Sequence, residues 1–268
     1  MNARFLIRGL LLAIPLAVLI SAGWILLQTP LLRPADPTPP PPTILAPQGA
    51  MPIGSVGLEE WAQYRDQPFR RVGSGFFFSL ANGEIVGATT SHSVSLSNTS
   101  HPLERIALGI AGHAGFVASL DTMRGQPGHR FKPEDLAADY LLLYVNVPIE
   151  SSLVLVPDPR GTPQPGERVS LYSGLGDDQG GRRVLEGTVQ SADKKAVWIL
   201  MDGWFNAGSM SGSPFVSQHT GQVVGMVVAG SPRLGRLLIG AHPVGSLLHL
   251  AESASQFPKL RDPTQTSE

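Results

Sequence analysis

The chain has 268 residues and a mass of 28.5 kDa, enough for one large domain or two small ones with a sizeable core. Its 20 Lys and Arg residues nearly balance 21 Asp and Glu residues, so the basic excess of a nucleic-acid-binding protein is missing. The sequence has no cysteine, which excludes disulfides, thiolate metal sites and a cysteine nucleophile. The 30 glycines and 24 prolines favour a β-rich fold over a helical bundle.

An uncharged apolar segment, residues 9–27, lies near the N-terminus. As a helix it spans about 28 Å, close to the thickness of a bilayer's hydrocarbon core. Arg4 and Arg8 precede it, which predicts that residues 1–8 are cytoplasmic. We therefore expect a transmembrane helix, or uncleaved signal-anchor, with the rest of the chain on the extracytoplasmic side. The alternative is a signal peptide cleaved after the small residues 21–23, which leaves the mature protein secreted.

Proline-rich sequence follows the apolar segment and predicts an extended linker over residues 28–54. Proline fixes φ and lacks an N–H group, so neither a helix nor a central strand is available there. Residues 55–256 are predicted to form the folded domain. The polar residues 257–268 are predicted to form a flexible tail.

Short apolar runs separated by turn residues fill the folded region. The first two, residues 76–80 and 85–89, flank Asn82-Gly83, which is typical of a β-hairpin. Further strands are expected at residues 140–147, 152–156, 169–172, 184–189, 196–201, 214–217 and 223–229, and a closing helix at residues 244–254. Many short strands at this spacing predict an all-β barrel or sandwich.

The most informative segment, residues 208–216, reads Gly-Ser-Met-Ser-Gly-Ser-Pro-Phe-Val. A serine between small residues, just before a strand, suits an exposed hydroxyl with backbone N–H groups aimed at one point. The segment resembles the nucleophile region of trypsin-like (chymotrypsin-fold) serine proteases, and of bacterial members with Ser-Gly-Ser-Pro in particular. The resemblance implies that Ser211 is the nucleophile. It also implies that the N–H groups of Ser209 and Ser211 form the oxyanion hole.

The same family places a histidine and an aspartate upstream of the serine, in the order His, Asp, Ser. His92 follows an apolar strand and a small-residue turn, and Asp139 directly precedes an apolar strand, as in the family. The resemblance implies that His92 accepts the serine proton and that Asp139 orients the imidazole. It covers about residues 72–250, and implies a chymotrypsin-like double β-barrel that uses no metal and no organic cofactor.

Each of these three residues also has a simpler interpretation as a turn, surface or strand-start residue. Their shared order, context and spacing favour the triad. The other histidines considered lie in loops, in a hairpin turn or on the last helix: His101, His113, His129, His219 and His249. Asp121 is the alternative acid, but no apolar run follows it.

Some positions depart from the family pattern. Ser209 stands where glycine is usual, and it is expected either to be tolerated or to hold the oxyanion hole inactive. Met210 stands where animal members have an aspartate that pairs with a new N-terminal amine, and we expect it to fill an apolar gap instead. The substrate pocket is expected near Phe205, Val228 and Gly230, which offer no charge to pair with a substrate. An apolar or small residue before the cut is therefore expected.

The sequence thus predicts a membrane-tethered serine endopeptidase that hydrolyses peptide bonds through an acyl-enzyme intermediate. The alternative is a catalytically impaired, protease-like module that binds a peptide as an added strand. The expected partners are a protein or peptide substrate and the membrane, through residues 9–27, but no nucleic acid.

Overall fold

The computed structural model describes residues 45–176, 183–233 and 235–262. The predicted membrane segment 9–27 and most of the predicted linker lie outside these ranges. Of the helices within them, none combines the length and apolar character that crossing a bilayer requires.

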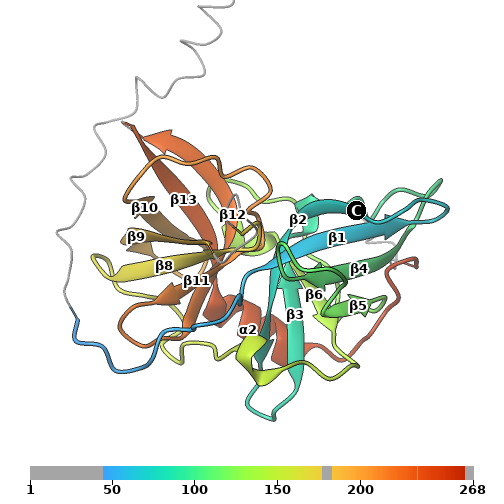
Figure 1. Cartoon of the computed structure of the whole chain (residues 1–268), viewed down its shortest axis with the longest axis horizontal. Coiled ribbons are helices and arrows are strands. Elements are labelled where there is room, and N and C mark those ends of the chain that lie inside the picture. Colours follow the sequence, from blue (N-terminus) through green and yellow to red (C-terminus); the bar gives the residue numbers. More distant parts are fainter. Residues whose placement is uncertain (1–44, 177–182, 234, 263–268) are drawn as a thin grey trace, which may run out of the picture. The chain divides into compact units, whose positions relative to one another are not determined.

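The first half of the body is a curved, mostly antiparallel sheet with the strand order β5-β4-β1-β2-β3-β6 (Figure 1). Its strands are β1 (Leu58–Tyr64), β2 (Arg70–Ser79), β3 (Ile85–Thr89), β4 (Leu103–Gly109), β5 (Ala118–Leu120) and β6 (Leu141–Tyr144), with β7 (Val154–Leu155) parallel to β2. Beyond β5, Met123 bridges to Leu143, and the N–H of Arg124 donates to the carbonyl of Leu142. The sheet therefore curls round until the segment after β5 meets β6, and this curled sheet is the first barrel.

The second half is a closed antiparallel barrel with the order β10-β13-β12-β11-β8-β9. Its strands are β8 (Arg168–Ser173), β9 (Arg183–Ala192), β10 (Val197–Met201), β11 (Pro214–Ser217), β12 (Val223–Arg233) and β13 (Arg236–Pro243). Helix α2 (Val244–Ser253) continues directly from β13. Closure pairs every strand on both sides, so this barrel has no free edge.

Strand β2 contributes side chains to two cores, because both of its faces are buried. Phe76, Phe77 and Phe78 are all completely buried. Since neighbouring side chains on a strand point to opposite faces, Phe77 packs inside the first barrel, whereas Phe76 and Phe78 pack in a second core. That second core includes Met226 of β12 and Leu247 of α2. The interface between the barrels is therefore apolar and includes the C-terminal helix.

Several predicted elements are confirmed. The hairpin is the β2–β3 pair, and Gly83 in its turn has φ +84°. The predicted helix 244–254 is α2. Strands β1, β4, β5 and β13 were not predicted. Charged residues or glycines interrupt the apolar pattern of β1, β4 and β13, and β5 has only 3 residues.

Residues on both sides of the predicted domain contact the barrels. The N–H of Gln48 donates to the carbonyl of His219 at 2.6 Å, and the hydroxyl of Tyr172 donates to the carbonyl of Pro52 at 2.8 Å. At the other end, Leu260 is completely buried. The body therefore includes the described end of the predicted linker and residues 257–262 of the predicted tail. Composition alone does not register such anchoring contacts.

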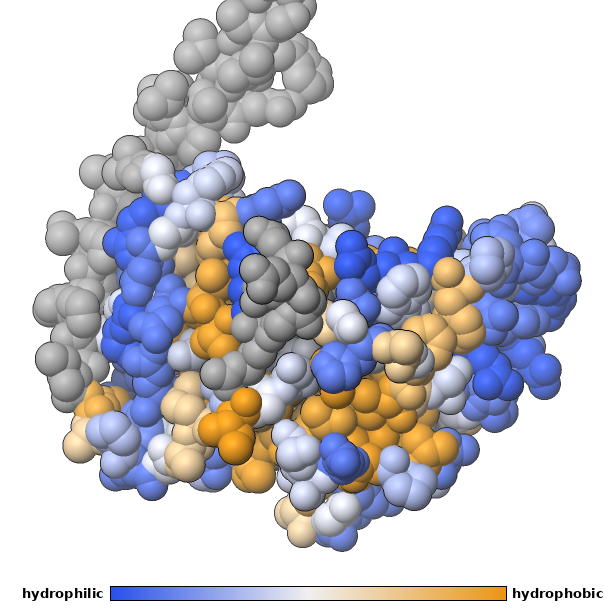
Figure 2. Space-filling view, viewed as in Figure 1, coloured by the Kyte–Doolittle hydropathy of each residue, from blue (hydrophilic) through white to orange (hydrophobic). Residues whose placement is uncertain are grey.

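Hydrophilic residues cover the margins of the face drawn in Figure 2, while apolar residues gather in the lower middle of the view. Few side chains that carry a full charge are buried in the interior. Within the described residues the buried ones are Glu60, Arg124, Asp139, Asp158 and Glu167. All of these except Glu60 form an ion pair with a described residue.

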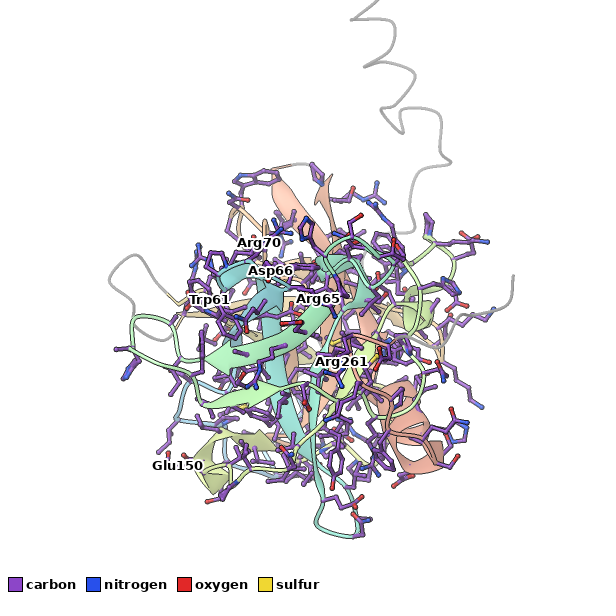
Figure 3. The ribbon with its side chains drawn as sticks, turned by 90° about the vertical axis from the view of Figure 1, so that its right-hand side faces the viewer. Trp61, Arg65, Asp66, Arg70, Glu150 and Arg261 are labelled. Carbon is purple, nitrogen blue, oxygen red and sulfur yellow. The ribbon has the colours of Figure 1, made fainter. Side chains whose placement is uncertain are left out.

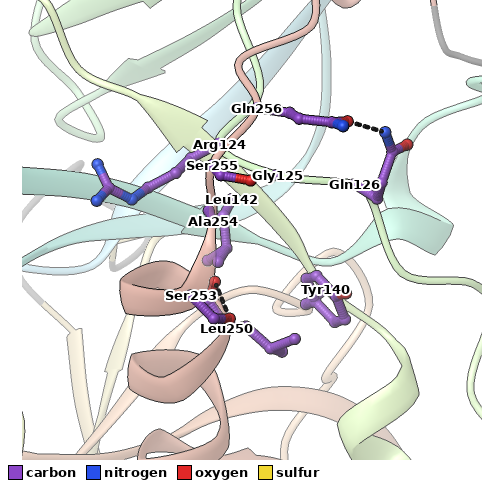
Figure 4. Close-up of a pocket in the computed structure, with 10 residues that line it drawn as sticks. All are labelled: Arg124, Gly125, Gln126, Tyr140, Leu142, Leu250, Ser253, Ala254, Ser255 and Gln256. Atoms are coloured by element: carbon purple, nitrogen blue, oxygen red, sulfur yellow. Dashed lines mark hydrogen bonds between the residues drawn. The ribbon is translucent and has the colours of Figure 1, made fainter.

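A pocket of ≈ 320 Å³ lies where the end of α2 meets the first barrel (Figure 4). Arg124 lines it, with a side chain only 6% exposed. The Nε of Arg124 donates to the carbonyl of Ala251 at 2.8 Å, and its guanidinium pairs with Glu84, also at 2.8 Å. Arg124 therefore fastens α2 to the first barrel. The lining includes none of the three predicted catalytic residues.

Candidate active site

His92 and Asp139 follow and precede two paired strands of the first barrel. In the antiparallel β3–β6 pair, Thr89 lies opposite Leu141. His92 lies in the short 3-10 turn Ser91–Ser93 just after β3, and Asp139 lies just before β6. The pairing brings the two side chains together, with 2.7 Å between His92 Nδ1 and Asp139 Oδ2.

Ser211 reaches this pair from the second barrel, in the turn before β11. Its Oγ lies 3.0 Å from His92 Nε2. Ser74 of β2 ties that turn to the first barrel: its N–H donates to the carbonyl of Ser211 at 2.9 Å, and its Oγ donates to the carbonyl of Ser209 at 3.0 Å. The three predicted catalytic residues thus form one chain of hydrogen bonds across the interface between the barrels.

The carboxylate of Asp139 is completely buried and accepts five hydrogen bonds. Oδ1 accepts from the N–H and Oγ of Ser91 and from the N–H of His92, and Oδ2 accepts from His92 Nδ1 and the N–H of Phe131. Burial by itself raises the pKa of Asp139, but the hydrogen bond and charge of His92, with the other donors, outweigh it and hold the pKa below its usual value. Because an ionised carboxylate only accepts, the Nδ1 of His92 carries the proton.

The turn before Ser211 has the geometry of a type II turn. The N–H of Met210 donates to the carbonyl of Ala207 at 3.1 Å, φ of Ser209 is +63°, and Gly208 is not among the positive-φ glycines. Such a turn requires positive φ at its third residue, so Ser209 adopts the left-handed conformation that glycine usually supplies. Within the described residues, the N–H groups of Ser209 and Ser211 donate to no protein acceptor. Two free donors therefore remain on the loop that carries the Ser211 hydroxyl.

Replacing Ser209 tests whether its positive φ affects the stability of the fold and the reactivity of Ser211. A non-glycine residue at positive φ costs about 1–2 kcal/mol, so we expect Ser209→Gly to raise the free energy of unfolding by about 1 kcal/mol and to preserve reactivity. A β-branched residue tolerates positive φ poorly, so Ser209→Val is expected to reorient the turn and lower the acylation rate of Ser211 about 10²–10³-fold. Chemical denaturation and the rate of labelling by a serine-directed probe measure the two effects. Wild-type labelling by Ser209→Val would contradict this role.

Met210 and Phe205 both lie in the core of the second barrel. Met210 is 0% exposed and Phe205 is 8% exposed, and both belong to the apolar cluster that includes Phe215. The space behind the turn that carries Ser211 is therefore filled by apolar side chains. Phe205 contributes to this packing, which limits its part in any substrate pocket.

The other two predicted pocket residues lie on β12. Val228 is 2% exposed and packs with Leu136. Gly230 is exposed, and a Cβ added to it would lie 3.4 Å from Ile239 Cδ1 and 3.6 Å from Ala207 Cβ. A Cβ at this position would therefore make ordinary van der Waals contact with apolar side chains.

The alternative residues lie elsewhere. Asp121 pairs with Lys259 at 2.9 Å, and both side chains are exposed. Within the described residues, none of the five other histidines considered forms a hydrogen bond with Asp139 or Ser211.

Several supporting residues were missed at the level of sequence. Ser91, Ser74 and the Phe131 backbone act through hydrogen bonds that only the folded chain creates. His242 of β13 is completely buried, and its Nδ1 lies 3.4 Å from the carbonyl oxygen of Asp139. Burial lowers the pKa of His242 to about 4, so its ring is neutral and donates to that carbonyl. No local pattern in the sequence distinguishes it from an ordinary strand residue.

Comparisons with known proteins give a likeness in structure alone. No family model matches the chain, and no curated protein matches its sequence. A serine endoprotease from Yersinia pestis is 17% identical with a TM-score of 0.48, over 74% of this chain and 64% of that protein. The thermostable serine protease AL20 from an extremophilic microorganism is 13% identical with a TM-score of 0.51, over 75% and 98%. Human heparin binding protein is 15% identical with a TM-score of 0.51, over 79% and 96%.

The likenesses to AL20 and to human heparin binding protein show the fold. The chain spans 64% of the Yersinia pestis protein and nearly the full length of the other two. The closed barrel, the curled first sheet and the C-terminal helix agree with a chymotrypsin-like double barrel.

Proposed function

We propose that the chain is a serine endopeptidase in which Ser211, His92 and Asp139 form the catalytic triad. The observation that carries this proposal is the chain of hydrogen bonds from Ser211 Oγ through His92 to Asp139, with distances of 3.0 and 2.7 Å. Serine proteases among the structural neighbours support a protein or peptide substrate.

The geometry supports a complete acyl-transfer cycle. The Nε2 of His92 takes the hydroxyl proton as Ser211 Oγ attacks the peptide carbonyl carbon. The resulting oxyanion accepts hydrogen bonds from the N–H groups of Ser209 and Ser211. The protonated His92 then donates to the amine nitrogen as the C–N bond breaks, which leaves an ester on Ser211. Water, deprotonated by His92, hydrolyses this ester and regenerates the serine, while Asp139 remains ionised throughout.

The apolar surroundings of Gly230 support a preference for a small or apolar residue before the scissile bond. Ile239 and Ala207 lie within van der Waals contact of a Cβ placed at Gly230, so apolar side chains border this position. Among the residues expected to line the pocket, neither Val228 nor Phe205 carries a charge to pair with a substrate. The same pocket therefore disfavours Lys, Arg, Asp and Glu at this position.

We also propose that residues 9–27 tether the catalytic body to the extracytoplasmic face of a membrane. This rests on the length of the uncharged segment and on Arg4 and Arg8 before it. Cleavage after residue 23 would instead secrete the body.

A fluorophosphonate probe tests the proposal on the full-length chain in washed membranes. We expect the probe to label wild-type protein in the carbonate-washed pellet, because an activated serine attacks phosphorus and displaces fluoride. Ser211→Ala removes the attacking oxygen and should abolish labelling. Ser213→Ala, two residues away, is the matched control that keeps Ser211.

Each failure has a distinct meaning. Labelling that persists in Ser211→Ala would place the nucleophile elsewhere. Folded wild-type protein that is not labelled would favour the peptide-binding module. A labelled soluble form that begins near Trp24 would contradict the tether and leave the triad standing.

A further inference from the structure

Strand β1 carries a carboxyl group into the interior of the first barrel. Buried and half-buried residues alternate along β1, and Glu60 shares its inward face with Leu58 and Ala62. Glu60 is 0% exposed and lies opposite Gly73 of β2 and Leu108 of β4. An acid therefore occupies a position at which the alternation predicts an apolar residue.

Other charged residues in this region lie at the surface. Arg65 and Asp66 lie in the loop that joins β1 to β2, Arg70 begins β2, and all three residues are exposed (Figure 3). The neighbouring carboxylate, Glu59, pairs with Arg71 at 2.8 Å. Glu60 is thus the member of this region whose ionisable group is completely buried away from water.

The missing side chain of Gly73 leaves space in which two groups, from Ser93 and Ser211, converge with the carboxyl group of Glu60. A Cβ on Gly73 would lie 2.6 Å from Glu60 Oε2, 2.9 Å from Ser93 Oγ and 3.3 Å from the carbonyl oxygen of Ser211. Ser93 ends the turn that carries His92, and Ser211 is the proposed nucleophile. The carboxyl group therefore lies directly behind the two residues whose side chains must meet.

No cation among the described residues compensates this carboxyl group. Within the same ranges, neither oxygen of Glu60 makes a hydrogen bond of normal geometry, and no ion pair involves it. The hydroxyls of Thr89 and Ser93 lie near enough to lower its pKa, and Ser93 Oγ lies 2.6 Å from Thr90 Oγ1. Burial raises the pKa of Glu60 to about 8, and these hydroxyls offset only part of the increase. At neutral pH the group is an uncharged acid.

The titratable groups on the elements around Glu60 are directed elsewhere. They are Glu59 on β1, Arg70 and Arg71 on β2, Glu104 and Arg105 on β4, and His92 on the turn after β3. Arg71 is paired with Glu59, and Glu104 is paired with Arg65 in the loop after β1. The ring of His92 is engaged by Asp139 and Ser211. Ionised Glu60 would therefore be a buried charge without a counter-ion.

We propose that Glu60 is a positioning residue: as an uncharged acid it packs behind the His92 turn and the Ser211 loop without disturbing them, and when it ionises it loosens both. Two physical effects act in the same direction. A buried carboxylate draws in water or moves away from the apolar core, which shifts Ser93 and the adjoining His92. Its negative charge also lies behind the loop that must stabilise an oxyanion. The reactivity of the site then falls at alkaline pH.

The labelling rate of full-length protein in detergent, followed from pH 6 to 9.5, tests this positioning role, and this readout rests on the proposed function. We expect the wild-type rate to fall at least about tenfold with a midpoint near pH 8, since small displacements of reacting groups have large effects. Glu60→Gln, which keeps the shape without the ionisable proton, should lose this decline. Glu59→Gln, on the outward face of the same strand, should retain it.

A second readout needs no reaction. The folded pKa of Glu60 is raised above its unfolded value of 4.5, so between pH 4.5 and about 8 the unfolded chain releases the proton first. Wild-type Tm should therefore fall relative to that of Glu60→Gln as pH rises through this window, and the difference should level off above it. The ring NMR signals of His92 should show a step near pH 8 that Glu60→Gln lacks.

The outcomes separate the two proposals. A wild-type rate with no alkaline decline, or a decline that persists in Glu60→Gln, would overturn the role of Glu60. Absence of labelling at every pH would defeat the proposed function, and the His92 signals would still decide whether Glu60 positions the turn. Should Glu60→Gln not fold, Glu60→Met provides the same uncharged comparison.

Discussion

Asp139→Asn is expected to lower the acylation rate of Ser211 by about 10⁴-fold while the fold is retained. The side chain keeps its size, so packing around it is unchanged. What changes is that one of its two acceptor oxygens becomes an NH₂ donor. The hydrogen-bond donors around Asp139 determine which of the two oxygens is replaced by the NH₂ group.

The new amide has a preferred orientation. Its NH₂ group would face three donors at the Oδ1 position, from Ser91 and His92, but only two at the Oδ2 position, from His92 Nδ1 and Phe131 N–H. It should therefore occupy the Oδ2 position. There it donates to His92 Nδ1, which drives the imidazole proton to Nε2. The Nε2 can then no longer accept the proton of Ser211.

Labelling rates measure this effect, and circular dichroism and thermal unfolding establish that the variant is folded. Asp121→Asn is the matched control, because Asp121 is an exposed carboxylate that pairs with Lys259 and not with His92. A large loss in Asp121→Asn, or a wild-type rate in Asp139→Asn, would show that Asp139 is not the orienting acid.

Arg160→Met is expected to lower the free energy of unfolding by about 3–5 kcal/mol at neutral pH. Arg160 binds two carboxylates at once, Asp158 at 2.6 Å and Glu167 at 2.9 Å. Their side chains are 0% and 1% exposed. Removing the guanidinium leaves two buried negative charges near each other. In the part of the chain that the structure describes, their remaining side-chain partners are the hydroxyls of Ser217 and Thr220.

The pH dependence follows from the direction of the shifts. Burial raises the pKa values of Asp158 and Glu167, but hydrogen bonds from Arg160 and the hydroxyls outweigh it and lower both. The stability that these carboxylates contribute is present above their unfolded values of 3.8 and 4.5, and it is lost as pH falls through the folded values. The penalty of Arg160→Met should therefore be largest near neutrality and shrink in acid.

Arg168→Met supplies the comparison. Arg168 also binds two carboxylates, Glu186 and Asp202, but these are 54% and 48% exposed. An exposed network of this kind contributes about 1 kcal/mol or less. Urea denaturation at pH 7 and pH 4 measures both variants. Equal penalties for the two would show that burial of the partners of Arg160 does not matter.

Local sequence was sufficient for the elements whose signals are short-range. The Asn82-Gly83 turn, the apolar runs on its two sides and the helix after Pro243 each depend on neighbouring residues, and all are present. The order and contexts of His92, Asp139 and Ser211 also sufficed to single out three residues that the fold brings within hydrogen-bonding distance.

Strands β1 and β13 were missed because their character depends on partners far away in the chain. The acids of β1 interrupt the alternation of apolar and polar residues. Its period-two burial pattern is therefore recognised only when β2 and β4 pair with it. In β13, His242 is acceptable in the core because the carbonyl of Asp139 meets its ring across the interface between the barrels. Propensity reports on neighbours in sequence, whereas burial and register are set by the whole sheet.

The sequence by itself determined the β-rich class, the absence of disulfides, the apolar N-terminal segment and the identity of the three candidate catalytic residues. Only the tertiary structure decided that Ser209 takes positive φ and that the buried carboxyl group of Glu60 lies behind Ser93 and Ser211. Turns, apolar runs and motifs each depend on residues that are contiguous in the sequence. A backbone conformation set by a loop's anchors, and the desolvation of a carboxyl group, arise from atoms that meet only when the barrels close.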